Sequence, residues 1–269
     1  MKLSMMTYSL ARNNAITDPK EMLELTVELG MDGIDFVTLY GHDAKDLRAL
    51  CDDHGVPVVA HTFFSPDLVA DDPATQKKGL DTCKRGIEAA HILGAPVVMI
   101  PTPGSDSLER GALRERWITG LERLAPVATQ AGIALTVENF PGARSPFVTA
   151  ADFEEAKARI PSLKLTYDNG NAAGGEDPVD SLRRTFDDIV HIHFKDWYIR
   201  PDAADGYRPM LDGRYFKPAL IGEGDIDTAA CWNALDRLGY QGHINLEYEG
   251  DEYGPREAMR KAVDYLRAL

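Results

Sequence analysis

Short β-type runs alternate with longer helical patterns eight times along this chain of 269 residues. The β-type runs lie at 2–9, 33–40, 57–64, 96–101, 133–139, 163–170, 189–197 and 242–250. Apolar residues recur at helical spacing at 18–29, 43–54, 73–93, 108–131, 150–160, 178–186, 228–238 and 255–269. Eight βα units in series predict an α/β fold, a closed parallel (β/α)8 TIM barrel, with residues 1–269 forming a single domain.

A doubly wound open sheet is the alternative for such an alternation. It is disfavoured because no GxGxxG or Walker loop follows the first β-type run, and because the candidate ligands come from the later runs. No Pro/Gly/Ser-rich linker or charge run marks a boundary between domains. Barrels of this length commonly form one domain.

The net charge of the chain indicates which binding partners to expect. Its cysteines indicate the cellular compartment. The chain has 43 Asp plus Glu against 29 Lys plus Arg, a net charge of −14, which disfavours nucleic acid and anionic membranes as partners. Its three cysteines are far apart and lack CxxC spacing, which is typical of a reducing cytoplasm. The N-terminus has no apolar signal-peptide core and no segment approaches transmembrane length, so we expect a cytoplasmic protein.

One β-type run has a polar face. In 189–197, His191, His193 and Lys195 alternate with apolar residues, so they share one side of a strand. Three other runs end in a carboxylate, which is Glu138 in ALTVEN, Asp168 in LKLTYD and Glu247 in HINLEYEG. At the carboxyl ends of barrel strands such side chains would converge.

Taken one at a time, each of these residues has an ordinary structural explanation, such as a solvated carboxylate, a turn cap or a packed imidazole. Together, three carboxylates crowded into a barrel mouth would repel one another unless protonated or bridged by a cation. The sequence therefore predicts a divalent metal site of mixed oxygen and nitrogen ligands. Oxygen predominates, which favours Mn or Mg and leaves Co and Zn open.

The segments GIDFVTLY, AHTFF, VENF, YDNGN, HIHFKD, IGEGDID and INLEYE resemble the sugar phosphate isomerase/epimerase family of xylose isomerase-like TIM barrels. The resemblance covers essentially the whole chain. It implies that the metal is held by Glu138, Asp168, His193 and Glu247. It also implies an enzyme of carbohydrate metabolism with a small sugar or polyol-derived substrate, and it allows for a homo-oligomer.

At two positions this chain departs from the pattern of the ketose 3-epimerases in that family, which narrows the expected activity. Ketose 3-epimerases of the family carry a second Glu six residues after the first metal Glu, and a His three residues after the metal Asp. This chain has Arg144 and Asn171 at those positions, which disfavours a standard free-ketohexose 3-epimerase. Arg144 supplies a cation suited to a substrate carboxylate or phosphate, or to a surface partner.

Further residues have candidate roles beside the ligands. Lys195 would stabilise negative charge on a substrate oxygen or pair with a neighbouring carboxylate. His61 is predicted to face inward and to bind substrate, or else to pack, and Glu223 to hydrogen-bond the metal histidine or a substrate hydroxyl. His191 is expected to orient a ligand or to lie in the core. The long segment 198–224 is expected either to close over a substrate or to serve as a passive or oligomer-contacting loop.

These residues predict a metal-dependent isomerase or epimerase of a small polyhydroxy carbonyl compound. Glu138 and Glu247 would act as base and acid as well as ligands. A carbon–oxygen lyase, such as an inosose dehydratase-like enzyme or a 3-oxo-sugar eliminase, is the alternative because it shares the first proton abstraction. A noncatalytic sugar-binding barrel is disfavoured because it would need no acid/base pair.

Overall fold

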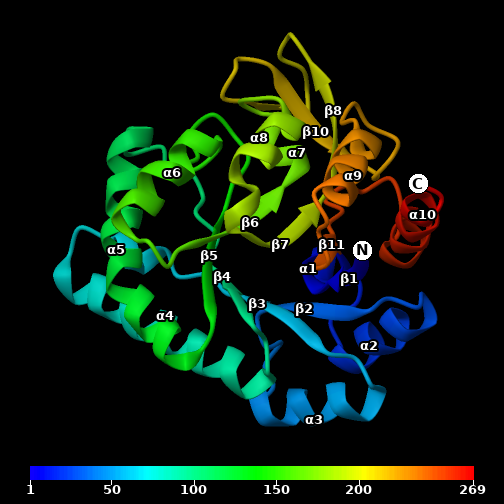
Figure 1. The fold of residues 1–269 in the computed structure, drawn as a ribbon, viewed down its shortest axis with the longest axis horizontal. Helices are drawn as coiled ribbons and strands as arrows, with labels where there is room; N and C mark the ends of the chain where they lie inside the picture. Colours follow the sequence, from blue (N-terminus) through cyan, green and yellow to red (C-terminus); the bar gives the residue numbers. More distant parts are fainter.

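Eight parallel strands close into a barrel at the centre of the computed structural model, which describes residues 1–269 (Figure 1). Neighbouring strands around the barrel follow the order β1-β11-β7-β6-β5-β4-β3-β2 and are paired in parallel. Their bounds are β1 Lys2–Met6, β2 Gly33–Val37, β3 Val58–Thr62, β4 Val97–Met99, β5 Ala134–Glu138, β6 Lys164–Asp168, β7 Ile189–Phe194 and β11 His243–Leu246. The predicted (β/α)8 barrel is confirmed.

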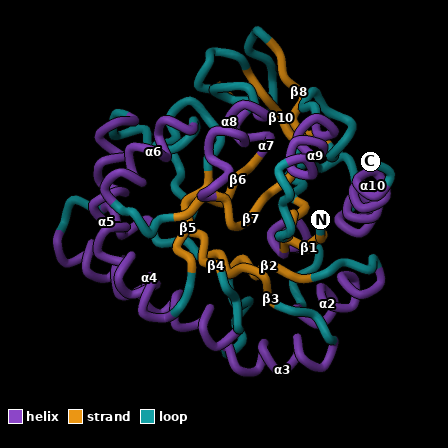
Figure 2. The backbone as a smooth tube through the Cα atoms, viewed as in Figure 1, coloured by secondary structure: helices purple, strands orange, loops and turns teal.

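A ring of helices surrounds the barrel (Figure 2). The main helices are α2 Pro19–Glu28, α3 Ala44–His54, α4 Pro73–Leu93, α5 Arg110–Ala131, α6 Ala150–Arg159, α8 Pro178–Thr185, α9 Thr228–Arg237 and α10 Pro255–Arg267. Shorter turns are α1 Thr7–Ala11, α7 Asn169–Ala172, η1 Arg12–Asn14, η2 Pro66–Val69 and η3 Phe186–Asp188. The predicted helices agree with the main ones to within two residues at each end.

The helix boundaries follow from capping chemistry. An aspartate side chain accepts a backbone hydrogen bond at the start of five main helices, at Asp18, Asp43, Asp72, Asp177 and Asp227. Each such cap stabilises a helix by roughly 1 kcal/mol. Left-handed glycines end α3, α4 and α5 at positions 55, 94 and 132, where other residues would be strained.

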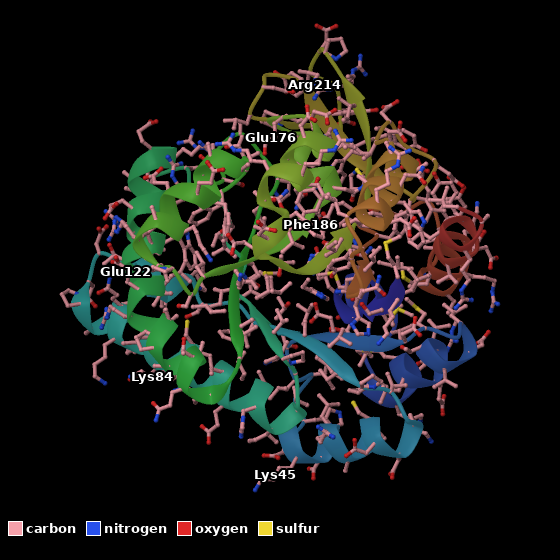
Figure 3. All side chains as sticks on the ribbon, in the orientation of Figure 1. Lys45, Lys84, Glu122, Glu176, Phe186 and Arg214 are labelled. Atoms are coloured by element: carbon pink, nitrogen blue, oxygen red, sulfur yellow. The ribbon has the colours of Figure 1, made fainter.

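The helices pack their apolar faces against the barrel. In α5, Trp117, Leu121 and Leu124 recur at helical spacing and are buried. On the outside, Lys45 and Lys84 extend from α3 and α4 away from the barrel (Figure 3). None of the helices combines the length and the apolar composition that crossing a membrane requires.

The strands are shorter than predicted at their carboxyl ends. The chain turns into α1 directly after Met6, and Thr38 and Tyr40 have left-handed backbone angles just beyond β2. These breaks are tertiary in origin, because the residues concerned have ordinary strand-forming side chains. They place the last side chains of the strands at the mouth of the barrel.

The segment after β7 forms a small antiparallel sheet beside the barrel mouth. Its strands are β8 Asp196–Arg200, β9 Arg208–Pro209 and β10 Tyr215–Ala219, in the order β8-β10-β9. In Figure 1 it lies outside the ring of helices, at the top of the view. Trp197 and Phe216 pack edge to face between this sheet and the barrel, with ring centroids 4.6 Å apart. The segment 198–224 therefore contains regular antiparallel strands, which the sequence interpretation did not predict.

Hydrogen bonds to Asp196 join the start and the end of the segment that contains the small sheet. Its buried carboxylate accepts backbone hydrogen bonds from Trp197, Gly222, Gly224 and Ile226 at 2.8–3.1 Å. A side chain at position 224 would collide with that carboxylate, because an added Cβ would lie 2.2 Å from Asp196 Oδ1. The close approach therefore requires glycine there.

Asp196→Ala should lower the free energy of unfolding by at least about 2 kcal/mol, because it leaves several buried or partly buried N–H groups without an acceptor. Urea denaturation of both proteins would measure the difference. Asp236→Ala, on an exposed position of α9, should change stability by no more than about 0.5 kcal/mol. Equal stability of the Asp196 variant and the wild type would contradict the role given to this carboxylate.

Candidate metal and active site

Four predicted ligand residues come together at the mouth of the barrel. Glu138 ends β5, Asp168 ends β6, His193 lies near the end of β7 and Glu247 follows β11. These strands are neighbours in the barrel order β11-β7-β6-β5. One ligand atom from each residue lies within 4.8 Å of every other, and all four side chains are buried. The arrangement could hold a single ion.

Asparagines hold the strand ends that carry the ligands. Asn139, directly after Glu138, donates to the backbone oxygen of Asp168 at 2.7 Å and accepts from its N–H at 2.8 Å. Asn169, directly after Asp168, accepts from the backbone N–H of Lys195 at 3.0 Å. Each asparagine therefore fixes the neighbouring strand end, which limits the movement of the next polar side chain.

Direct contacts link the four side chains with Lys195. His193 Nδ1 lies 2.7 Å from Glu138 Oε1 and 3.4 Å from Glu247 Oε2. Lys195 Nζ lies 3.0 Å from Glu247 Oε1 and 3.4 Å from Asp168 Oδ2. The imidazole nitrogen Nδ1 is thus the one that faces Glu138 and Glu247.

The carboxylates differ in their electrostatic surroundings. Burial raises the pKa of Asp168 well above its usual value, and the charges of Glu138 and Glu247 raise it further against the opposing effect of Lys195. Burial also acts on Glu247, but there Lys195 and His193 outweigh it and lower the pKa to about 2. The shorter contact of Lys195 with Glu247 explains the difference.

The donor set fits a divalent cation. Asp168 Oδ2 and Glu247 Oε2 are buried and accept no hydrogen bond, although Lys195 Nζ and His193 Nδ1 respectively lie 3.4 Å away. Leaving such oxygens unpartnered costs free energy, and a cation among them would remove that cost. Three carboxylates and one imidazole suit Mn, Mg, Co or Zn. Glu138, Asp168, His193 and Glu247 are the residues that would hold the ion.

Asp35 lies behind the ligand residues and contacts two histidines. The sequence interpretation did not predict this residue as part of the site. It lies fully buried on β2, accepts from Asn245 Nδ2 at 2.9 Å, and lies 3.6 Å from His191 Nε2 and 3.7 Å from His193 Nε2. The two imidazoles hold the pKa of Asp35 well below its usual range in spite of its burial. The available signal was a single charged residue within the apolar run GIDFV.

Asp35→Asn should weaken metal binding by about 10–100-fold, because a carboxylate behind a ligand histidine orients the ring and makes it a better ligand. Titration calorimetry of the metal-free protein with Mn²⁺ would measure the change in metal affinity. Asp53→Asn, exposed at the end of α3, is the matched control and should leave affinity unchanged. An unaltered affinity in the Asp35 variant would contradict the orienting role.

A cavity of about 190 Å³ opens beside the ligands. Its polar lining includes Thr62, Glu138, Lys195, Arg208, Glu247 and Glu249, and its remaining lining is Met6, Tyr8, Val37, Phe64, Met99, Pro101, Phe140 and Pro141. The volume is below the range of drug-sized sites and suits a small molecule. Lys195 therefore lies at the cavity, as the sequence interpretation expected.

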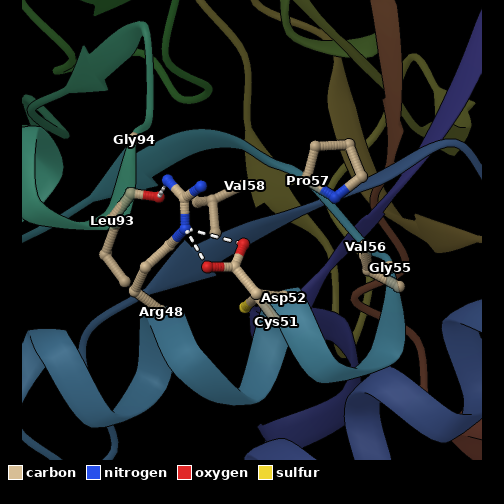
Figure 4. A pocket seen from close by; sticks show the side chains of 9 residues that line it. All are labelled: Arg48, Cys51, Asp52, Gly55, Val56, Pro57, Val58, Leu93 and Gly94. Atoms are coloured by element: carbon tan, nitrogen blue, oxygen red, sulfur yellow. Dashed lines mark hydrogen bonds and ion pairs between the residues drawn. The ribbon is translucent and has the colours of Figure 1, made fainter.

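A larger hollow of about 350 Å³ lies at the opposite end of the barrel (Figure 4). Arg48 spans it, with Nε 2.8 Å from Asp52 Oδ1 and a guanidinium nitrogen 3.1 Å from the backbone oxygen of Leu93. It lies where helices end and strands begin, a face that serves stability in these barrels. No candidate ligand cluster borders it.

His61 does not line the cavity. Its Nδ1 lies 2.8 Å from the backbone oxygen of Phe36, and its ring packs near Phe63. The next residue, Thr62, lines the cavity and lies 3.4 Å from Asp35 Oδ1. The two residues point to opposite sides of β3. The predicted inward position is thus displaced by one residue, since both neighbours are polar and the sequence does not distinguish the faces.

Arg144 and Glu223 also lie apart from the ligands. The Arg144 side chain is about half exposed and donates to the backbone oxygens of Ser105 and Asp106 at 2.7 and 3.1 Å. Glu223 accepts from Tyr253 at 2.9 Å and pairs with Lys261 of α10 at 2.9 Å. The structure therefore gives both side chains protein partners outside the cavity.

The fold agrees with comparisons to known proteins. A family model described as xylose isomerase-like TIM barrel matches residues 23–269. An inosose dehydratase from Lacticaseibacillus casei is 27% identical over 277 residues, covering 94% of this chain and 90% of that protein. An L-ribulose-5-phosphate 3-epimerase from Shigella flexneri serotype 5b (strain 8401) is 26% identical over 216 residues, covering 78% of this chain and 69% of that protein.

A solved structure of IOLI protein with a binding zinc atom has the same fold. It is 19% identical, with a TM-score of 0.81 over 100% of this chain and 97% of that chain. At that identity the likeness is one of fold. The family model, in contrast, matches nearly the whole sequence. The chain belongs to the xylose isomerase-like TIM barrel family.

Proposed function

We propose that this protein is a divalent-metal-dependent isomerase or epimerase of a small sugar, keto-sugar or related polyhydroxy carbonyl compound. The supporting observation is that Glu138 and Glu247 reach one cavity from two different strands and flank His193 there. Two carboxylates in such a position can exchange a proton with carbon next to a carbonyl group. The names of the two relatives described above give inosose and L-ribulose 5-phosphate as their substrates.

The chain's own residues divide the work of proton transfer. Either Glu138 or Glu247 accepts the proton from carbon, and the other returns it. Return to the opposite face of the same carbon is epimerisation, and return to the neighbouring carbon is aldose–ketose isomerisation. The metal, when bound, supplies Lewis-acid polarisation of the substrate carbonyl.

Lys195 is a hydrogen-bond donor in this scheme. Burial alone would lower the pKa of its ammonium, but Asp168, Glu247 and Glu249 outweigh burial and raise it well above its usual value. The ammonium therefore stays charged at neutral pH and cannot act as a base. It can instead stabilise negative charge that develops on a substrate oxygen at the cavity.

A dehydratase is the second candidate, supported by the inosose dehydratase relative that covers most of this chain. The same abstraction of a proton next to a carbonyl would then be followed by loss of the β-hydroxyl as water. The glutamate that returns the proton in an epimerase would protonate that leaving group instead. The two reactions differ in product and share the first step.

Wash-in of solvent deuterium tests the shared first step. Mn²⁺-loaded protein in D2O is incubated with inosose, L-ribulose or D-fructose, and mass spectrometry and NMR follow each compound. We expect deuterium at the carbon next to the carbonyl in at least one of them. A product lighter by one water identifies the dehydratase, and an isomeric product the isomerase or epimerase. Neither exchange nor product across a wider panel of polyhydroxy carbonyl compounds would contradict the proposal.

A further inference from the structure

An ion pair from two distant parts of the chain forms the outer wall of the cavity. Glu249, two residues after Glu247, lies 3.3 Å from a guanidinium nitrogen of Arg208 on β9. The other Glu249 oxygen lies 3.3 Å from Lys195 Nζ. Arg208 also lies over the ring of Phe216, 4.8 Å from its centroid. Both members of the pair line the cavity, and neither has a part in the proton transfer described above.

Carboxylates outnumber cations around the cavity. Four carboxylates belong to the cluster and the cavity, which are Glu138, Asp168, Glu247 and Glu249. A fifth, Asp35, lies fully buried 3.7 Å from His193. Two cations, Lys195 and Arg208, line the cavity. One divalent cation would offset two of the negative charges, which leaves no net positive charge to attract an anionic substrate.

The cavity cations are already opposed by carboxylates. Lys195 contacts three carboxylates, and one guanidinium nitrogen of Arg208 contacts Glu249. The Arg208 side chain is 53% exposed, whereas that of Glu249 is only 12% exposed. A phosphate or carboxylate bound to Arg208 from the cavity side would therefore lie beside a largely desolvated carboxylate, which is unfavourable.

We infer that the cavity takes an uncharged polyhydroxy carbonyl compound, whose hydroxyls at the end away from the reacting carbons bind the Arg208–Glu249 pair. This inference rests on the proposed function. Arg208 offers hydrogen-bond donors and Glu249 offers acceptors, and a hydroxyl group needs both. Glu249 in this arrangement is a specificity-determining residue, because its negative charge lies beside the one guanidinium that lines the cavity and opposes a phosphate there.

Inorganic phosphate is the first probe, because its binding needs no turnover. Calorimetry on Mn²⁺-loaded protein should show that Glu249→Gln binds phosphate at least about tenfold more tightly than the wild type, since the variant removes the carboxylate charge beside the guanidinium. Adding Arg208→Ala should abolish the gain. Glu252→Gln removes the same charge at an exposed position outside the cavity lining and should change nothing. Equal phosphate affinity of Glu249→Gln and wild type would overturn the inference.

The second probe is the pair L-ribulose and L-ribulose 5-phosphate, which differ only in the phosphate group. Deuterium exchange should give the wild type a kcat/KM at least about tenfold higher for the uncharged sugar, and Glu249→Gln should shrink that ratio. Preference of the wild type for the phosphate would overturn the inference. Absence of deuterium exchange with every sugar would instead contradict the proposed function. The phosphate titration would still decide whether Glu249 opposes the binding of an anion at Arg208.

Discussion

Asp168→Ala and His193→Ala should each reduce bound metal from about one divalent ion per chain to a small fraction of that. Both residues lie fully buried among the other ligands, so alanine at either position removes one of the four ligand atoms. Elemental analysis of the purified proteins, after equilibration with equal free Mn²⁺, would measure the occupancy. Chelation of the wild type should also lower its Tm, because the ion binds the folded state.

Two further proteins make the metal experiment decisive. His42→Ala removes an exposed histidine far along the sequence from the ligands and should keep full metal content. Circular dichroism of the two ligand variants should retain the helical signal of the wild type, so that lost metal is not a consequence of unfolding. Full occupancy in both folded variants would exclude the four-residue metal site.

Glu138→Gln and Glu247→Gln should each lower turnover by at least about 100-fold, the usual loss when a general acid or base is removed. Glutamine keeps the shape of the side chain and one oxygen for the metal, but it cannot accept a proton from carbon. Turnover of the substrate identified by the deuterium experiment would be measured in excess Mn²⁺, with occupancy checked for each variant. Glu88→Gln, exposed on α4, should behave as the wild type.

The two glutamine variants should differ from each other. If one glutamate only abstracts the proton and the other only returns it, single-turnover deuterium exchange survives in one variant alone. A dehydratase would need the abstracting glutamate for exchange and the other for protonating the leaving hydroxyl. Near wild-type turnover by both variants, fully loaded with metal, would leave Glu138 and Glu247 as ligands without a part in proton transfer.

Local patterns were sufficient to predict the barrel and the ends of its helices. The alternation of strands and helices, the aspartate caps and the terminal glycines act over a few neighbouring residues, so they can be read directly from the sequence. The same holds for Glu138, Asp168, His193 and Glu247. Parallel strands of a barrel all end at one face, so the strand position of each residue already brought it to the mouth.

Only the tertiary structure decided which side chains meet beyond that rule. The orientation of β3 puts the side chain of Thr62, and not that of His61, at the cavity. The contacts of Asp35 with the two histidines depend on where β2 lies in the barrel, so the sequence did not reveal them. Arg208 and Glu249 are 41 residues apart and meet because the three-stranded sheet brings Arg208 of β9 to the cavity. Such contacts depend on long-range packing, and no local pattern of residues encodes them. The sequence by itself determined the scaffold and the inventory of polar groups at strand ends, while packing determined which of those groups face one another.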